Sequence, residues 1–137
     1  MILFCEKIGL LIKYDEEKNA FEFFDLPICD NIKKYNKYAY LHFNNYIFLF
    51  GGYHVDINVN ISISRLIYKY IINEKIWTKM NQELPLCLAD SIALLNKNYI
   101  YIIGGSNESF TLYFNFFYPR GKNFQQLFLY MLFKSFI

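Results

Sequence analysis

Short apolar and aromatic runs, separated by turn residues, recur along the chain. Residues 39–43 and 46–50 are two such runs, and an asparagine pair lies between them. Apolar runs of this length around an asparagine pair are typical of a β-hairpin, so we expect two antiparallel strands here. Residues 65–72 and 76–80 form a second pair around a polar turn. The central part of the chain is therefore predicted to be a unit of four short strands.

The same alternation of strand and turn extends to both sides of this central unit. Residues 8–14 and 20–24 are predicted to be the third and fourth strands of an incomplete first unit. Residues 91–95 and 99–103 are predicted to be the first two strands of a last unit. Within the central unit, residues 53–64 are expected to form a longer loop between the second and third strands.

A glycine pair ends two of the predicted strands. The segment NNYIFLFGG finishes at Gly51-Gly52 and the segment NKNYIYIIGG at Gly104-Gly105, an offset of 53 residues (104 − 51). A period of about 50 residues is typical of arrays of multi-stranded units. Glycine at a strand end permits a positive φ and a close approach of two backbones. We interpret the pairs as structural, because neither fits a phosphate-loop motif.

An aromatic pair marks the second half of each unit. Tyr14 precedes Phe21 by seven residues, and Tyr70 precedes Trp77 by the same distance. The motif LPIC follows the first aromatic pair, and the motif LPLC follows the second. The distance from the aromatic pair to the motif is two residues longer in the second case. We therefore expect a short insertion before Pro85. Two patterns that recur in the same order indicate a repeat more strongly than either pattern alone.

This combination resembles the kelch repeat, in which a strand ending in Gly-Gly is followed by a variable loop, a strand with Tyr, and a turn leading to Trp. In the central unit these positions are Gly51, Gly52, Tyr70 and Trp77, and the flanking units carry Gly104, Gly105, Tyr14 and Phe21. Phe21 replaces the usual Trp. The resemblance implies an all-β fold, a partial β-propeller of four-stranded antiparallel kelch-type blades.

The resemblance also implies a division of the chain. The expected parts are the C-terminal half of a first blade, a complete blade, a third, degraded blade and an apolar tail, at residues 1–30, 38–86, 90–129 and 130–137. Tyr118 and Phe124 are candidates for the Tyr and Trp positions of the third blade. Two to three blades do not close a ring, so we expect a fragment of a larger propeller. Its open blade edges would favour self-association.

The function implied by the resemblance is a non-catalytic kelch-repeat scaffold that binds a protein partner through its loops. Loops held by a rigid scaffold commonly carry function, so the loop 53–64 is the candidate site. Within it we select Tyr53, His54 and Asp56 as partner-binding residues. Two alternatives stay open, a fragment of a galactose-oxidase-like propeller enzyme and a truncated non-functional product.

Composition and charge exclude several other classes of protein. A hydrophobic content of 55% and an aromatic content of 21% exclude a disordered chain. The formal net charge is +2 and the longest basic cluster is Lys33-Lys34, so we expect no nucleic-acid partner. The apolar C-terminal run is shorter than a spanning helix and contains Lys134, so we expect no membrane partner.

The residues that could carry chemistry are few and dispersed. The two histidines, His42 and His54, do not form a zinc-binding set, and we expect no metal and no cofactor. The acidic run from Asp15 to Glu17 lies between two predicted strands and is interpreted as a solvated hairpin tip. The three cysteines are far apart in sequence, which favours reduced thiols in a cytoplasmic protein. No residue is predicted to be catalytic.

Overall fold

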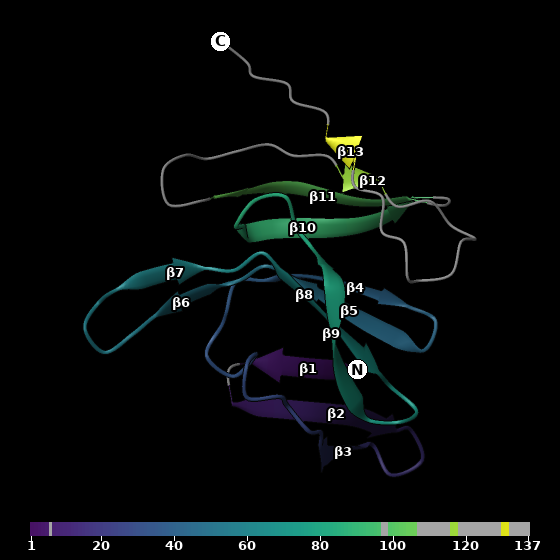
Figure 1. Ribbon diagram of the computed structural model, residues 1–137. Helices are drawn as coiled ribbons and strands as arrows, with labels where there is room; N and C mark the ends of the chain where they lie inside the picture. Colours follow the sequence, from purple (N-terminus) through teal and green to yellow (C-terminus); the bar gives the residue numbers. More distant parts are fainter. Residues whose placement is uncertain (6, 97–98, 107–115, 118–129, 132–137) are drawn as a thin grey trace.

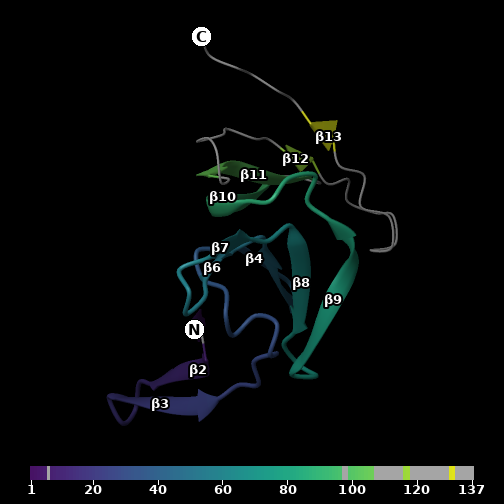
Figure 2. The same ribbon diagram turned by 60° about the vertical axis from the view of Figure 1, so that its left-hand side comes forward.

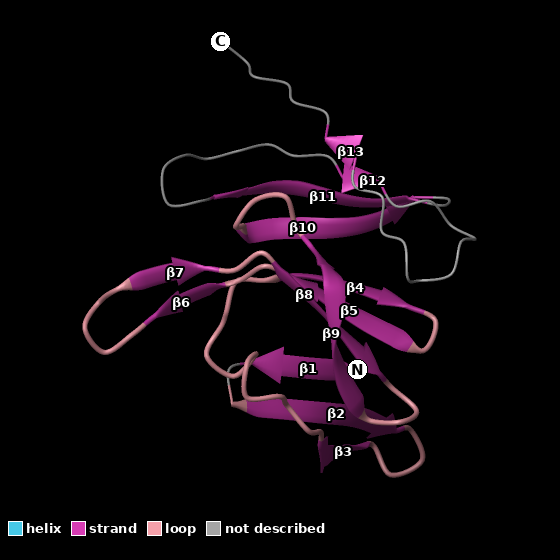
Figure 3. Ribbon diagram, in the orientation of Figure 1, coloured by secondary structure: helices cyan, strands magenta, loops and turns pink. Residues whose placement is uncertain are grey.

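The computed structural model describes residues 1–5, 7–96, 99–106, 116–117 and 130–131 of the chain. In this part of the chain every regular element is a strand (Figure 3), and the sheets are antiparallel. The fold is therefore all-β, as predicted. Among the same residues, no helix is long and apolar enough to span a membrane.

Three sheets account for most of the described residues. The first sheet contains β1 (Ile2–Cys5), β2 (Ile8–Asp15) and β3 (Ala20–Asp25). The central sheet contains β4 (Ala39–Phe43), β5 (Tyr46–Phe50), β8 (Leu66–Ile71) and β9 (Ile76–Glu83). The last sheet contains β10 (Ala89–Asn96) and β11 (Tyr99–Ser106). They are stacked in chain order, with the central sheet between the other two (Figures 1 and 2).

The central sheet confirms the predicted unit of four strands. Its order is β4-β5-β8-β9, so consecutive strands of the unit are neighbours, and a separate hairpin interrupts the sequence between β5 and β8. That hairpin consists of β6 (Tyr53–Val55) and β7 (Ile61–Ile63), within the segment predicted to be a loop. The structure also adds β1, which pairs with β2 ahead of the first predicted strand.

The predicted insertion before Pro85 is present as an irregularity of the central sheet. The β8–β9 pairing shifts its register between Leu66 and Tyr68, whereas the equivalent β2–β3 pairing is regular along its length. A bulge of this kind lets one strand carry more residues than its partner. Both aromatic pairs lie within the regularly paired parts of their strands.

The aromatic pairs of the repeat are cross-strand partners. Tyr14 is opposite Phe21 in the first sheet, with ring centroids 5.0 Å apart. Tyr70 is opposite Trp77 in the central sheet, with ring centroids 4.8 Å apart. Aromatic pairs at directly opposite positions stabilise antiparallel ladders. The seven-residue spacing seen in the sequence is thus the spacing of two facing positions in a hairpin.

The glycine pairs adopt the same backbone conformation in both units. The φ angles are +71° and +115° at Gly51 and Gly52, and +73° and +107° at Gly104 and Gly105. Lys37 and Asp90, 53 residues apart, share φ values of 55° and 56°. This agreement supports the predicted structural role of the glycines, because only glycine adopts such angles freely.

Repeat-equivalent residues also meet where the central and last sheets join. The backbone N–H of Asp90 donates to the carbonyl oxygen of Lys37 at 2.9 Å, and the Lys37 ammonium lies 3.2 Å from the Asp90 carboxylate. Nearby, the N–H of Gly52 donates to the carbonyl oxygen of Leu88 at 2.8 Å. The connection entering the last sheet is therefore hydrogen-bonded to the glycine pair of the central sheet.

Apolar side chains fill both spaces between the sheets. The core between the central and last sheets consists of Ala39, Leu41, Phe48, Phe50, Ile67, Met80, Leu84, Leu88, Ala93, Ile100 and Ile102. The core between the central and first sheets is built on Ile32, Ile47, Leu49, Tyr68 and Tyr70. Strand β5 contributes alternate residues to the two cores, which explains its uninterrupted apolar sequence. The central sheet is thus covered on both faces.

Aromatic packing joins the first sheet to the central one. The Phe4 ring makes edge contacts with Tyr70 and Trp77, at centroid distances of 5.1 and 4.8 Å. The indole N–H of Trp77 donates to the carbonyl oxygen of Pro27 at 2.7 Å, and the Tyr38 hydroxyl donates to that of Phe4 at 2.7 Å. The aromatic pair of the central sheet therefore lies in the interface with the preceding unit.

The C-terminal part of the chain contributes two further short strands. Strand β12 (Phe116–Phe117) pairs with β13 (Tyr130–Met131). Tyr118, Phe124, most of the predicted third blade beyond residue 106, and residues 132–137 of the predicted tail lie outside the described residues. The assignment of residues 90–129 as one blade stays a prediction.

Candidate interaction site

The β6–β7 hairpin extends from the central sheet, away from the stacked sheets (Figure 1). Its two strands are held together by the pairing of Tyr53 with Ile63 and of Val55 with Ile61. At its base, Tyr53 and Asn36 exchange two backbone hydrogen bonds, of 2.7 and 2.9 Å. A short hairpin is marginal by itself, so this anchor is what fixes its direction.

Two of the residues selected from the sequence lie at the base of the hairpin. Tyr53 is half-buried, and the Lys37 ammonium lies 5.4 Å from the centroid of its ring. His54 is half-buried and meets the ring of Tyr35 edge-on at a centroid distance of 5.8 Å. These contacts orient the hairpin on the central sheet. Both side chains keep part of their surface accessible to a partner.

The third selected residue, Asp56, organises the turn. Its Oδ1 accepts the backbone N–H of Asn58 and of Asn60, each at 2.8 Å, and its Oδ2 accepts the Asn60 side-chain amide at 2.9 Å. The side-chain hydrogen bond from Asn60 is the main reason that the pKa of Asp56 lies below its ordinary value, with the backbone hydrogen bonds adding to it. In an Asx-type turn of this kind, the side chain accepts hydrogen bonds from backbone N–H groups that no neighbouring strand pairs.

The hydrogen bonds to Asp56 predict a pH-dependent turn. Because the folded pKa lies below the ordinary 3.8, the ionised carboxylate stabilises the turn above pH 3.8, and this contribution is lost as the pH falls through the folded value. In an NMR titration, the Asn58 and Asn60 amide protons should shift with one midpoint below 3.8. The Asp56→Asn variant should show no such transition, and a midpoint above 3.8 in the parent chain would contradict the geometry.

The tip of the hairpin carries exposed apolar side chains that the sequence reasoning did not select. Ile57 is 98% exposed and Val59 is 76% exposed, and Val55 and Ile61 beside them are also exposed. The signal was present in the sequence as alternate apolar residues from Val55 to Ile61. Clustered exposed apolar residues on a protein surface commonly mark interaction sites.

Val59 has a backbone conformation that is costly for its residue type. Its φ is +64°, and a β-branched residue in the left-handed region is a genuine outlier. The turn holds it there, since the Val59 N–H donates to the Asp56 carbonyl at 3.0 Å. Strain of this kind is concentrated at functional sites. An apolar side chain is thus retained where asparagine or glycine would be more stable.

Replacing Val59 should therefore raise stability. Asparagine tolerates the left-handed region, so Val59→Asn should increase the free energy of unfolding by about 1 kcal/mol. Urea denaturation followed by tryptophan fluorescence measures the change. As a control, Ile57→Asn changes a neighbouring exposed residue without positive φ and should leave stability within about 0.5 kcal/mol. A loss of stability in Val59→Asn would show that its backbone is not strained.

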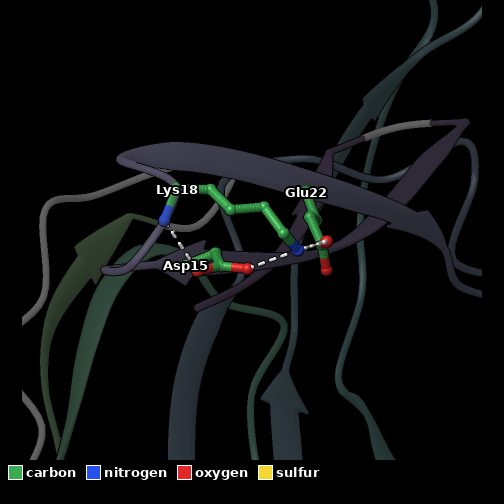
Figure 4. Close-up of polar contacts among 3 residues, drawn as sticks. All are labelled: Asp15, Lys18 and Glu22. Atoms are coloured by element: carbon green, nitrogen blue, oxygen red, sulfur yellow. Dashed lines mark hydrogen bonds and ion pairs between the residues drawn. The ribbon is translucent and has the colours of Figure 1, made fainter.

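The acidic run predicted to be a hairpin tip lies in the β2–β3 turn (Figure 4). The Lys18 ammonium is 2.7 Å from the Asp15 carboxylate and 3.8 Å from that of Glu22. The backbone N–H of Lys18 also donates to Asp15 at 3.1 Å. The hydrogen bonds from the Lys18 side chain and backbone lower the pKa of Asp15. The cluster is a solvated turn, as predicted.

The remaining candidates for chemistry lie apart from one another. The ring Nε2 of His42 lies 2.9 Å from the carbonyl oxygen of Asn44, at the β4–β5 turn, whereas His54 belongs to the β6–β7 hairpin. Cys29 and Cys87 are free thiols. Within the described ranges, no group of three or more His, Cys, Asp or Glu side chains is arranged to hold a metal ion.

Comparison with known proteins gives a likeness of fold. No protein-family model and no curated protein matches the chain. The structure of YjhT is similar to it, with a TM-score of 0.63 and 14% sequence identity over 74% of this chain. The likeness covers 29% of the YjhT chain, so the present chain spans less than a third of that protein. At this identity, the comparison concerns the fold alone.

Proposed function

We propose that this chain is a non-catalytic interaction scaffold, a partial β-propeller of kelch-type blades that binds a protein partner through the β6–β7 hairpin. Three features support the blade assignment: the central meander of four strands, the matching conformation of the glycine pairs, and the aromatic pair in each hairpin. The likeness to part of a longer chain fits a segment of a larger array. A cytoplasmic location belongs to the same proposal.

The observation that carries the binding proposal is the apolar hairpin tip on an anchored base. Asp56 directs its hydrogen bonds to the turn itself, so the tip presents Ile57 and Val59 to solvent. Exposed aliphatic anchors gain free energy when a partner buries them, and a pre-ordered turn reduces the entropy lost on binding. The partner surface expected from this chemistry is an apolar depression with hydrogen-bonding groups at its rim.

Affinity capture with variants of the tip tests this proposal. The chain is immobilised, and bound proteins from a lysate are quantified by mass spectrometry for the parent chain and for Ile57→Asp. The amount of specifically captured protein should be at least ten-fold lower for Ile57→Asp than for the parent chain, because a carboxylate would enter an apolar contact. Ile76→Asp, an exposed isoleucine at the start of β9, is the matched control and should capture the parent amount.

Two further variants locate the binding surface on the hairpin. Tyr53→Ala and His54→Ala remove the aromatic residues at the base, and we expect a smaller loss than for Ile57→Asp because both are half-buried. Equal capture by all three hairpin variants and by the parent chain would show that the partner binds elsewhere. Capture lost equally in Ile76→Asp would show that the effect is unspecific.

A further inference from the structure

Among the described residues, the first and last sheets each carry exposed apolar side chains on the face turned away from the central sheet. The outer face of the first sheet carries Leu3, Ile8, Tyr14, Phe21 and Phe23, which the alternation of the strands places on one side. The outer face of the last sheet carries Ile92, Leu94 and Ile103. Apolar side chains on a sheet face normally form a core with a second layer, so each face calls for a cover.

The face of the last sheet repeats a face that is covered inside the molecule. Ile92 lies 53 residues after Ala39 and occupies the same register position, since Ile92 pairs with Ile103 as Ala39 pairs with Phe50. Ala39 is 1% exposed because the last sheet packs over it, whereas Ile92 is 64% exposed. The outer face of the last sheet is therefore equivalent to the central face that receives the next unit.

The face of the first sheet repeats the opposite face of the central sheet. Tyr14 and Phe21 correspond to Tyr70 and Trp77, which the first sheet covers with Phe4. Tyr70 is 0% exposed and Tyr14 is 50% exposed. The outer face of the first sheet is therefore equivalent to the central face that receives the preceding unit. The two open faces are the two unlike halves of one kind of interface.

The surroundings of the two glycine pairs differ in the same way as the two sheet faces. A Cβ atom at Gly51 would lie 2.0 Å from the carbonyl oxygen of Leu88, where the next unit begins, but a Cβ at Gly104 would meet none of the described residues within 4 Å. Gly104 nevertheless has the conformation of Gly51. The last sheet thus retains the backbone geometry that, in the central sheet, receives the following unit.

From these equivalences we infer that a second copy of this chain docks head-to-tail, with the outer face of its first sheet on the outer face of the last sheet. Both interfaces inside the molecule join unlike faces, and a second copy supplies the missing half of each. Such an association is heterologous. An open chain of copies keeps one free face of each kind at its two ends, whereas a closed ring of copies has no free face. Neither of the two interfaces inside the molecule pairs two like faces.

Complementary surface variants test this arrangement. Variant one carries Ile92→Asp and Leu94→Asp on the last sheet, and variant two carries Phe21→Asp and Phe23→Asp on the first sheet. All four residues are exposed in the single chain, so its fold should survive. Analytical ultracentrifugation should show a parent mass that rises with concentration, and each variant alone should be monomeric. An equimolar mixture should form a 1:1 complex of the two variants, because each retains the face that the other lacks.

Each other outcome overturns the inference. A parent chain that stays monomeric at its highest soluble concentration would show that something other than a second copy covers the faces. Self-association of either variant alone would indicate pairing of like faces, and a mixture that stays monomeric would exclude head-to-tail docking. Circular dichroism checks the fold of each variant. If a double variant does not fold, Leu94→Lys and Phe23→Lys replace it and must give the same pattern.

Discussion

Gly51→Ala should destabilise the chain far more than Gly104→Ala, although the two glycines have the same backbone conformation. Their φ angles are +71° and +73°, so an alanine at either position incurs left-handed strain of about 1–2 kcal/mol. At Gly51 the new Cβ would also lie 2.0 Å from the Leu88 carbonyl oxygen and 3.2 Å from that of Ser64. These neighbours are backbone atoms, so the connection between the sheets must move.

We expect Gly51→Ala to cost about 4 kcal/mol or more, in the range reached when overpacking is added to backbone strain. Gly104→Ala should cost only the strain, because no atom of the residues that the structure describes lies within 4 Å of its new Cβ. Equilibrium denaturation in urea measures both values, and their difference reports the contact between the central and last sheets. Equal losses in the two variants would show that this contact does not form.

Tyr70→Ala should cost about 3–5 kcal/mol, as for other large aromatic side chains removed from a core. Tyr70 is 0% exposed and is enclosed by Phe4 of the first sheet and by Trp77. Tyr14 is its repeat equivalent on the open face, so Tyr14→Ala should cost about 1 kcal/mol or less. The pair of variants compares one side chain with and without a covering sheet.

Tyr70→Phe separates packing from hydrogen bonding at the same position. The Tyr70 hydroxyl is buried and, among the described residues, has no hydrogen-bond partner. Removing it should keep the free energy of unfolding or raise it by about 1 kcal/mol, because a buried unpaired hydroxyl is costly. Denaturation followed by tryptophan fluorescence gives all three values. A Tyr70→Phe variant as unstable as Tyr70→Ala would contradict the packing described here.

The central unit could be predicted from the sequence because its local signals agree. The apolar runs 39–43 and 46–50 coincide with β4 and β5, and the asparagine turn between them is a hairpin turn. The glycine pairs were recognisable since their conformation is difficult for any other residue. The two-residue difference between the units appeared as the irregular register of β8 and β9.

Strand β1 and the β6–β7 hairpin were not predicted, because their local signals in the sequence do not agree. Strand β1 has four residues, too few to show an alternating pattern, and its pairing with β2 depends on tertiary contacts. In the segment 53–64 the alternation of apolar residues is that of a strand, but the Asp56 turn folds it into a hairpin. Length alone favoured a loop there, and the hydrogen bonds of Asp56 decided the structure.

A partner-binding role of the segment 53–64 stays a prediction, and the exposure of its side chains could not be predicted from residue type. Tyr53 and His54 suggested binding because they are aromatic and polar, and the structure places them at the hairpin base. Ile57 has the composition of a core residue, and only the projection of the hairpin makes it exposed. Ile92 has the same ambiguity, since its exposure depends on the absence of a covering unit among the described residues.

Successive sheets of this fold are stacked face to face, and nuclear Overhauser contacts of the Phe4 ring would detect that stacking in solution. Phe4 belongs to the first sheet, and its ring centroid lies 5.1 Å from that of Tyr70 and 4.8 Å from that of Trp77 in the central sheet. This stacking predicts cross-peaks from the Phe4 ring protons to both rings. Cross-peaks between Tyr70 and Trp77 without any to Phe4 would contradict it, because the hairpin would then exist without the stack.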